Sequence, residues 1–306
     1  MRLISLSTEE RKPRDLAQKF HYGGQAVIEG VMMRGPKLMK VAVRRSNDEI
    51  ASHVEPLGAL YSGPLRQRPL LRGFLVLVET LALGIKALLY SAKVSAESEL
   101  EAEINPAVFW LAAVLGIMLG LILFVAVPLL IAHFGLDRFI TSPILSNLAD
   151  GLMRVVIFLL YLKGMALIPD IRRVFAYHGA EHKAVNAYEA GAPLEVEEVQ
   201  KYSTAHTRCG TGFLLLVLVI AILAFVFLGR PALWLRFLSR LALLPVIAAV
   251  SYEVIRFAAD HLGNPFVRAI LAPGLWLQRL TTRQPDEKQL EVAIEALQGV
   301  LEKDQV

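Results

Sequence analysis

The stretch FWLAAVLGIMLGLILFVAVPLLIAHF, residues 109–134, decides the fold class of this chain because it contains no Asp, Glu, Lys or Arg. The uncharged region extends from Ile104 to Leu136. A helix of about 20 apolar residues crosses the hydrocarbon core of a bilayer, so this region predicts a transmembrane helix. A second uncharged region, Cys209 to Gly229, contains FLLLVLVIAILAFVFL and predicts another.

Two weaker apolar segments, residues 152–168 and 241–257, accompany these spans and complete two helical hairpins. Charged side chains near their ends can reach the membrane surface, whereas Lys163 and Glu253 are expected to face protein or water. A fifth apolar segment, residues 70–90, is interrupted by charged residues and is expected to form an interfacial or buried helix instead of a span. The sequence therefore predicts an α-helical integral membrane protein with four transmembrane helices.

The composition agrees with a membrane protein and excludes other classes. With 55% hydrophobic residues, the chain is more apolar than soluble domains, which are about 45–50% apolar. A net charge of +4 is too small for a nucleic-acid binder that works by neutralising phosphates. The single cysteine, Cys209, cannot form an intrachain disulfide, so a reducing compartment is expected. The first twenty residues are too charged for the apolar core of a signal peptide.

The distribution of lysine and arginine predicts a multi-pass plasma-membrane protein with both termini in the cytoplasm. Five basic residues lie between positions 66 and 93, before the first span, whereas the connection from 135 to 151 contains only Arg138. Basic residues favour the cytoplasmic side, so this connection is expected outside. Membrane lipid is an expected partner of the protein. The second outer connection goes against this assignment, because it carries Arg230, Arg236 and Arg240.

Five parts follow from this topology. They are a cytoplasmic β-rich N-terminal unit with the interfacial helix (1–103), a first transmembrane hairpin (104–168), a cytoplasmic His/Cys loop (169–212), a second hairpin (213–257) and a cytoplasmic tail (258–306). In the first unit, Gln25–Met33 predicts one strand and Ser46-Asn47-Asp48 predicts a hairpin turn. In the tail, apolar residues at helical spacing over 286–301 predict an amphipathic helix.

Chemically active residues concentrate in the loop between the hairpins, in YHGAEHKAVNAYEAG (177–191). The composition predicts a helix that ends at Gly191. At about 100° per residue, His178, Glu181 and His182 share one face and alanines occupy the opposite face. An alanine face lets the helix lie close to a neighbour, which would hold the polar face rigidly. Histidines at i and i+4 have the spacing at which two imidazoles share one metal ion.

The same residues match H-x-x-E-H, the inverzincin form of the zinc-peptidase signature, in which the histidines bind zinc and the glutamate, here Glu181, activates water. A further ligand is needed. His206 and Cys209, spaced H-x-x-C at the start of the second hairpin, are the candidates, and these donors suit zinc. Glu189 lies about 10.5 Å along the helix from His182, so it is expected to support the ligands instead of joining them.

Each of these residues also has a structural interpretation. Cytoplasmic histidines are often exposed or simply hydrogen-bonded, and a cysteine at a helix start is often a small packing residue. Arg172, Arg173 and Lys183 would in that case contact anionic lipid headgroups. Two other carboxylates are candidates for the site. Glu29 either points outward from its strand or faces the site, and Glu253 is expected to orient a substrate.

At these residues the sequence resembles the bacterial YqhQ-like integral membrane proteins. The resemblance rests on blocks in the same order: GGQAVIEGVMMRGP (23–36), YHGAEHKAVNAYE (177–189), HTRCGTGF (206–213), SYEVIRFA (251–258) and PGLWLQRLTTRQPDEKQLEVAI (273–294). That family is described as a domain of unknown function and a predicted metal-dependent enzyme. The resemblance therefore implies a metal role that falls on His178, Glu181, His182, His206 and Cys209.

Three functions remain open. The first is a metal-dependent hydrolase in the membrane, with zinc as the expected divalent metal, Glu181 as general base, and a peptide or lipid-linked substrate at the cytoplasmic boundary. The second is a non-enzymatic scaffold or assembly factor with a structural metal site. A structural site is closed by four protein ligands, whereas a catalytic site keeps one position open. The third is a transporter, although few ionisable residues are intramembrane and no inverted repeat is visible.

Overall fold

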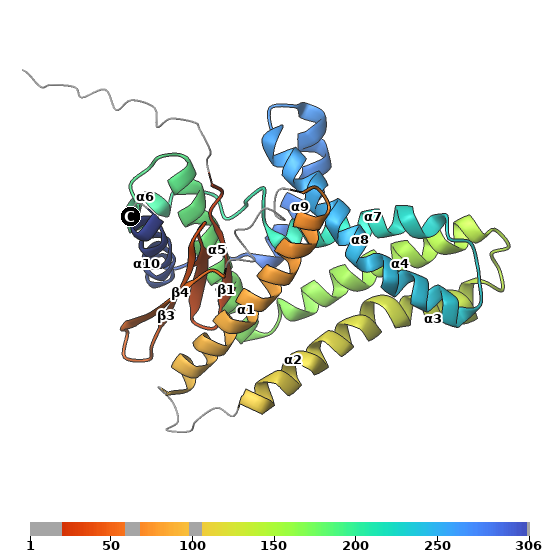
Figure 1. Cartoon of the computed structure of the whole chain (residues 1–306), viewed down its shortest axis with the longest axis horizontal. Helices are drawn as coiled ribbons and strands as arrows, with labels where there is room; N and C mark the ends of the chain where they lie inside the picture. The colour runs from red at the N-terminus through yellow and green to blue at the C-terminus, as the bar shows by residue number, and fades with distance from the viewer. Residues whose placement is uncertain (1–19, 59–67, 98–105, 305–306) are drawn as a thin grey trace, which may run out of the picture.

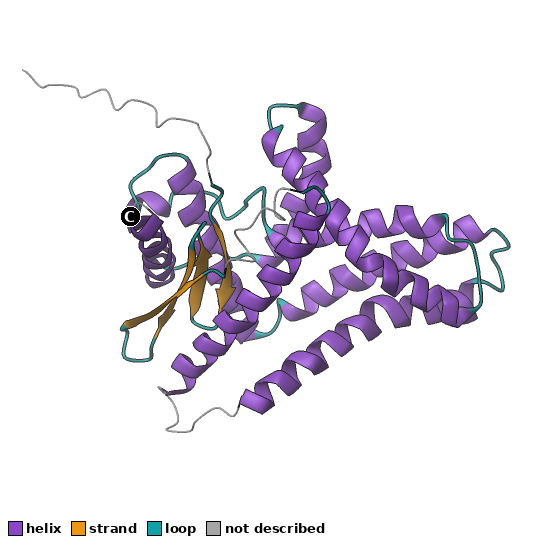
Figure 2. Cartoon of the chain, viewed as in Figure 1, coloured by secondary structure: helices purple, strands orange, loops and turns teal. Residues whose placement is uncertain are grey.

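The computed structural model describes residues 20–58, 68–97 and 106–304 (Figure 1). Helices dominate, and the strands form a single sheet near the N-terminus (Figure 2). The sheet and two helices form a compact unit at one end of the molecule, and long apolar helices extend from it as a bundle (Figure 1). The prediction of a mostly helical chain with a small N-terminal β-unit is confirmed for these residues.

The sheet is an antiparallel meander in the order β1-β2-β3-β4. Its strands are β1 (Gly23–Val27), β2 (Gly30–Arg34), β3 (Leu38–Arg44) and β4 (Ile50–Pro56). The hairpin turn at residues 46–48 is confirmed, but the prediction of one strand over Gln25–Met33 is wrong. The chain turns at Ile28 and Glu29, where Glu29 has a φ of 51°. Two-residue hairpin turns use positive φ values, so Glu29 lies in a turn and not on a strand face.

Helices cover both faces of the sheet. On one face, α5 (Pro169–Glu189) and α10 (Glu287–Asp304) bury Val31 and Met33 of β2. On the other face, the second half of α1 (Leu71–Glu97) buries Met32. Successive strand residues point to opposite faces, which is why the run Val31-Met32-Met33 supplies both cores. The predicted amphipathic tail helix is α10, whose Leu290 and Leu297 are fully buried.

The apolar bundle consists of four helical segments. They are α2 (Pro106–Leu121) continued through η3 (Ile122–Ala126), α3 (Val127–Ile131) and η4 (Ala132–Leu136), then α4 (Pro143–Met165), α7 (Gly210–Val226) and α8 (Leu233–Asp260). The expected starts of the two weaker spans, residues 152 and 241, are wrong. Both helices begin earlier, at Pro143 and Leu233, because the charged residues that precede the expected starts, such as Asp150 and Arg236, are buried inside the bundle.

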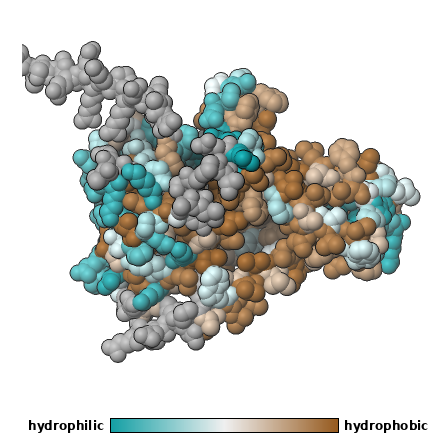
Figure 3. All heavy atoms as spheres, viewed as in Figure 1, coloured by the Kyte–Doolittle hydropathy of each residue, from teal (hydrophilic) through white to brown (hydrophobic). Residues whose placement is uncertain are grey.

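Among the described residues, four helices are long and apolar enough to cross a membrane: Leu71–Ala96, Trp110–Leu136, Pro143–Met165 and Leu233–Asp260. The helix Gly210–Val226 is equally apolar but shorter. The set includes α1, which was expected to be interfacial or buried. Its first half contacts α8 and exposes Phe74 and Leu81, while its second half packs on the sheet. The visible face of the bundle is apolar between more polar ends (Figure 3).

Two further helices, α6 and α9, complete the fold. One is α6 (Val196–Val199), which contacts α5 and α10. The other is α9 (Pro265–Thr281), which was not predicted within the tail and packs on α7. The approach of α9 and α7 is close, because a Cβ added to Gly274 would lie 3.2 Å from Gly212 Cα. After α9 the chain runs alongside α5 before α10 begins.

Gly179 sets the distance between α5 and that returning chain. A Cβ at this position would lie 2.1 Å from the carbonyl oxygen of Arg283. The Arg283 N–H also donates to the carbonyl of Phe175, one turn earlier on α5. The backbone of residues 281–283 is therefore held directly against the helix that carries the histidines.

Replacing Gly179 with alanine is expected to destabilise the protein by about 1–3 kcal/mol, because α5 and the backbone of Arg283 would have to separate. Thermal unfolding of the purified full-length protein in detergent measures this loss. Gly164→Ala is a matched control, since a Cβ on this helical glycine meets nothing within 4 Å and alanine favours helix. Equal unfolding midpoints for the two variants would contradict the close approach.

Candidate metal centre

Three potential metal ligands from two separate elements converge where the bundle meets the sheet unit. His178 and His182 lie one turn apart on α5, and Cys209 is the residue that caps the start of α7. One ligand atom from each of the three lies within 4.8 Å of the others. We call these three residues the candidate metal centre.

Backbone carbonyls orient both imidazoles. The Nδ1 atom of His178 lies 2.9 Å from the carbonyl oxygen of Thr281, and that of His182 lies 2.6 Å from the carbonyl oxygen of Thr204. A carbonyl oxygen only accepts hydrogen bonds, so each Nδ1 carries the proton and donates it. In the neutral rings Nε2 then keeps its lone pair. Metal-binding histidines in proteins show this same arrangement, which fixes the tautomer and the ring orientation.

Cys209 supplies the sulfur from the start of α7, whereas both histidines come from α5. Its Sγ atom lies 3.3 Å from Nε2 of His178 and accepts a hydrogen bond from the Thr211 N–H. The residue is 5% exposed and its sulfur sits at the N-terminus of α7. Unpaired N–H groups at a helix N-terminus favour negative charge, so this position suits a sulfur that binds a cation as a thiolate.

Glu181 lies beside the candidate metal centre and is also buried. Its Oε1 atom accepts a hydrogen bond of 2.9 Å from the Gly24 N–H at the start of the sheet. Its Oε2 atom lies 3.9 Å from Nε2 of His182, the ring atom that keeps its lone pair. One carboxylate oxygen is thus anchored to the backbone of β1, and the other faces the space next to the ligands.

His206 lies next to this group but is not part of it. The side-chain amide of Gln278 forms two hydrogen bonds with the backbone of His206. Gln278 Oε1 accepts from the His206 N–H, and Gln278 Nε2 donates to the His206 carbonyl. The His206 ring is 5.6 Å from the His182 ring, between centroids. Its Nε2 atom lies 3.5 Å from a carboxylate oxygen of Glu189.

Glu189 is accordingly a partner of His206 and of Arg208. Burial raises the pKa of this carboxyl, but the adjacent His206 ring and the charge and hydrogen bond of Arg208 outweigh it and lower the pKa to about 2. Glu189 is therefore a carboxylate at neutral pH, and it links the loop before α7 to the C-terminal end of α5. Glu189 is not among the three residues of the candidate metal centre.

The other two carboxylates singled out in the sequence lie elsewhere. Glu253 on α8 forms an ion pair with Arg72 and accepts from the Leu70 N–H. Glu29 forms an ion pair with Arg173 and accepts a hydrogen bond of 3.3 Å from the Tyr177 hydroxyl.

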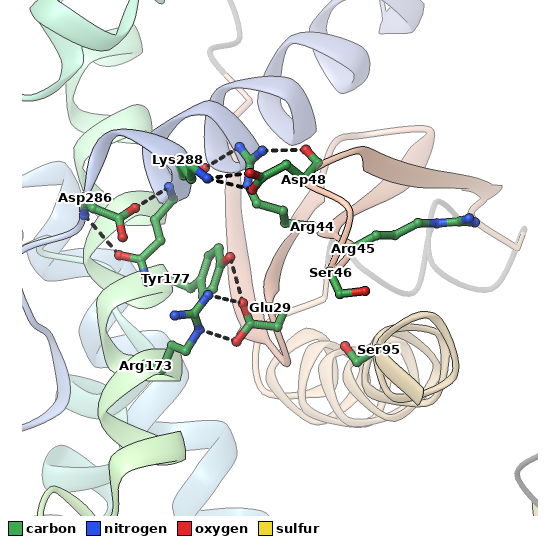
Figure 4. A pocket seen from close by; sticks show the side chains of 11 residues that line it. Glu29, Arg44, Arg45, Ser46, Asp48, Ser95, Arg173, Tyr177, Asp286 and Lys288 are labelled. Carbon is green, nitrogen blue, oxygen red and sulfur yellow. Dashed lines mark hydrogen bonds and ion pairs between the residues drawn. The ribbon is translucent and has the colours of Figure 1, made fainter. Parts of the chain in front are cut away.

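The Glu29–Arg173 pair lines a polar cavity of about 480 Å³ between the sheet, α1, α5 and the start of α10 (Figure 4). The cavity also contains the Lys288–Asp48 ion pair. Its lining residues include none of the candidate metal centre, so this cavity is a separate feature.

Two polar side chains of α5, Lys183 and Asn186, hold the loop of residues 200–206 in place. Their spacing in the sequence did not indicate this role. Lys183 was a candidate for lipid headgroups, but it is 4% exposed and donates to the carbonyls of Gln200 and Tyr202. Burial lowers the pKa of its ammonium group. Asn186 donates to the carbonyls of Ser203 and Ala205 in the same loop. These contacts fix the path of residues 200–206, and hence the Thr204 carbonyl that orients His182.

Comparison with known proteins places this site in a family without an assigned function. Residues 68–303 match the family model described as "Protein of unknown function (DUF1385)". The chain is 35% identical over 303 residues to "Uncharacterized protein YqhQ" from Bacillus subtilis (strain 168), covering 92% of both chains. No solved structure matches. The chain belongs to the DUF1385 family of YqhQ-like proteins.

Proposed function

We propose that this protein is a membrane-bound zinc-dependent hydrolase that works at the cytoplasmic boundary of the bilayer, with His178, His182 and Cys209 as the metal ligands. One observation carries the proposal. Both histidines have Nδ1 held by a backbone carbonyl, so that Nε2 is left for a metal, and the Cys209 sulfur lies beside them.

The separations suit a zinc ion. With Zn–N distances of about 2.0–2.1 Å and Zn–S distances of about 2.3 Å, two tetrahedral nitrogen ligands lie about 3.3–3.4 Å apart, and a nitrogen and a sulfur lie about 3.5–3.6 Å apart. The distance between Cys209 Sγ and His178 Nε2, 3.3 Å, is within about 0.3 Å of the nitrogen–sulfur separation. The whole group lies within 4.8 Å, so side-chain movements of about 1 Å would bring His182 to the same spacing.

Three protein ligands leave one tetrahedral position open, as in catalytic sites. A zinc ion held there would supply a Lewis acid and lower the pKa of water. Glu181 then acts as general base, because its free carboxylate oxygen faces the ligands while the other is fixed by the Gly24 N–H. The same carboxyl group can return the proton to the leaving group.

The position of Cys209 at the start of an apolar helix supports a site at the membrane boundary. A peptide or lipid-linked molecule is the substrate class that reaches such a boundary. We place this boundary on the cytoplasmic side of the plasma membrane, together with the sheet unit and α10, because basic residues precede the first apolar helix of the bundle.

Metal binding and catalysis are tested separately by substituting His182 and Glu181. Full-length protein purified without chelators is expected to contain about one zinc ion per chain, and His182→Ala to lose it. Glu181→Gln is expected to keep the metal and lower the turnover of peptide or lipid-linked test substrates by about 10²–10⁴. Elemental analysis and hydrolysis assays on the same preparations measure both quantities.

His53→Ala is the control for this experiment, since His53 lies exposed on β4 away from the candidate metal centre. It should keep both metal and turnover. A wild-type protein free of zinc would overturn the metal site, whereas full metal content with unchanged turnover in Glu181→Gln would overturn the role of Glu181.

A structural metal site in a scaffold protein is the second candidate, and the position of His206 favours it. Its ring lies 5.6 Å from that of His182, so a rotation of the side chain away from Glu189 could supply a fourth ligand. Four protein ligands would close the site to substrate.

Substituting His206 decides between the two candidates. The hydrolase proposal expects His206→Ala to retain zinc, because His206 pairs with Glu189. A scaffold with a closed site expects the same variant to lose zinc and to unfold at a lower temperature. Zinc content and the unfolding midpoint of the two proteins, compared in parallel, give the answer.

The orientation is tested by labelling introduced cysteines with a membrane-impermeant maleimide. Asn47→Cys, in the β3–β4 turn, is expected to react only after the membrane is permeabilised. Arg138→Cys, in the exposed connection before α4, is expected to react in intact cells. The native Cys209 is buried and should give little background. Labelling in the opposite order would reverse the proposed topology.

A further inference from the structure

A cluster of charged side chains is buried inside the bundle. These side chains come from the N-terminal halves of α4 and α8, which lie in the part of the bundle farther from the sheet (Figure 1). Asp150 and Arg154 come from α4, and Arg236 and Arg240 come from α8. None of these four residues is more than 3% exposed. We call Arg154, Arg236 and Arg240 the arginine cluster.

The carboxylates near the arginine cluster do not balance its charge. Asp150 pairs with Arg154 at 3.1 Å and with Arg240 at 2.8 Å. Asp137, just before α4, pairs with Arg236 at 2.8 Å and lies 3.6 Å from Arg230. The three guanidinium groups of the cluster thus share two carboxylates in this part of the described structure, and one of these carboxylates also lies near the partly exposed Arg230, so positive charge is in excess.

Several guanidinium N–H groups of the cluster also have no acceptor. Among the described residues, Nε of Arg154, Nε of Arg236 and Nη1 of Arg240 are buried without a hydrogen-bond partner. The Phe225 ring lies 5.1 Å from the Arg154 guanidinium carbon and 5.4 Å from that of Arg240. This ring holds the two groups through cation–π contacts but accepts no conventional hydrogen bond from them.

An unbalanced arginine inside an apolar bundle is costly, and ionisable groups at such positions usually serve ions or substrates. Excess positive charge together with buried, unused N–H donors matches an oxyanion, because guanidinium groups bind phosphate through paired N–H···O bonds. We propose that the arginine cluster binds a phosphate group within the bundle. This inference does not depend on the metal site, which lies near the sheet.

The phosphate could belong to a lipid or be free inorganic phosphate. An apolar groove of about 320 Å³ between α3 and α8 is lined in part by Leu233 and Phe237, in the same turns of α8 as Arg236. The groove gives a reason to test a lipid phosphate beside the free ion.

The experiment uses full-length protein purified in an uncharged detergent. The thermal unfolding midpoint is recorded against inorganic phosphate, dioctanoyl phosphatidic acid, dioctanoylglycerol as the lipid without phosphate, and sodium chloride at matched ionic strength. At least one phosphate probe is expected to raise the midpoint saturably, while dioctanoylglycerol and chloride do not. A response to both phosphate probes identifies the free ion as sufficient, and a response to phosphatidic acid alone identifies the lipid.

Two substitutions of opposite sign separate binding from simple structural pairing. Arg240→Gln removes one positive charge and should raise the half-saturating concentration about tenfold or more. Asp150→Asn removes a competing carboxylate and should lower it. A cluster that only holds helices together predicts lower midpoints for both variants and no saturable response in any protein.

Arg138→Gln is the matched control, since Arg138 is exposed at the same end of the bundle. It should leave the half-saturating concentration unchanged. Absence of a saturable response in the wild-type protein would overturn the proposal, and so would equal losses in Arg138→Gln and Arg240→Gln. If Arg240→Gln does not fold, the wild-type titration and Asp150→Asn still decide the question.

Discussion

The direct contact between α5 and the backbone that returns from α9 is the constraint on which the candidate metal centre depends. It is possible because residue 179 has no side chain, so the Arg283 carbonyl can approach the helix. That approach brings the Thr281 carbonyl to His178. On the same side of α5, nearer its C-terminal end, Lys183 and Asn186 bind the loop that presents the Thr204 carbonyl to His182. Backbone atoms thus orient both imidazoles, and backbone positions are less variable than side-chain rotamers.

The bundle is constrained by its apolar interior, in which charged groups must have partners or ligands. The arginines at the connection between α7 and α8 went against the orientation expected from basic residues in the sequence. In the structure Arg236 and Arg240 point into the bundle and pair with Asp137 and Asp150. They act as interior groups and not as loop charges. The count of basic residues that guides topology is therefore lower on this side than the sequence suggests.

The candidate metal centre and the arginine cluster lie toward opposite ends of the bundle, so each can be tested without disturbing the other. Glu253, first considered as a substrate-orienting group, belongs to neither. It joins α8 to α1 through Arg72, where Gly73 also lets the two helices approach closely. Membership of a family without an assigned function makes these buried polar groups the most direct guide to what the chain does.

The sequence by itself determined the features that repeat locally along the chain: the apolar helices, the amphipathic tail helix, the β3–β4 hairpin, and the i, i+4 pair of histidines on one helix face. Tertiary structure decided which distant residues join that pair. Cys209 lies beside His178, while His206, three residues earlier, is held by Gln278 and turned toward Glu189. Spacing could not separate these two, because their positions depend on α9 packing against α7 and on the loop path set by Lys183. The residue pattern also could not show that Glu29 lies in a turn, because β1 and β2 together form one apolar run in the sequence.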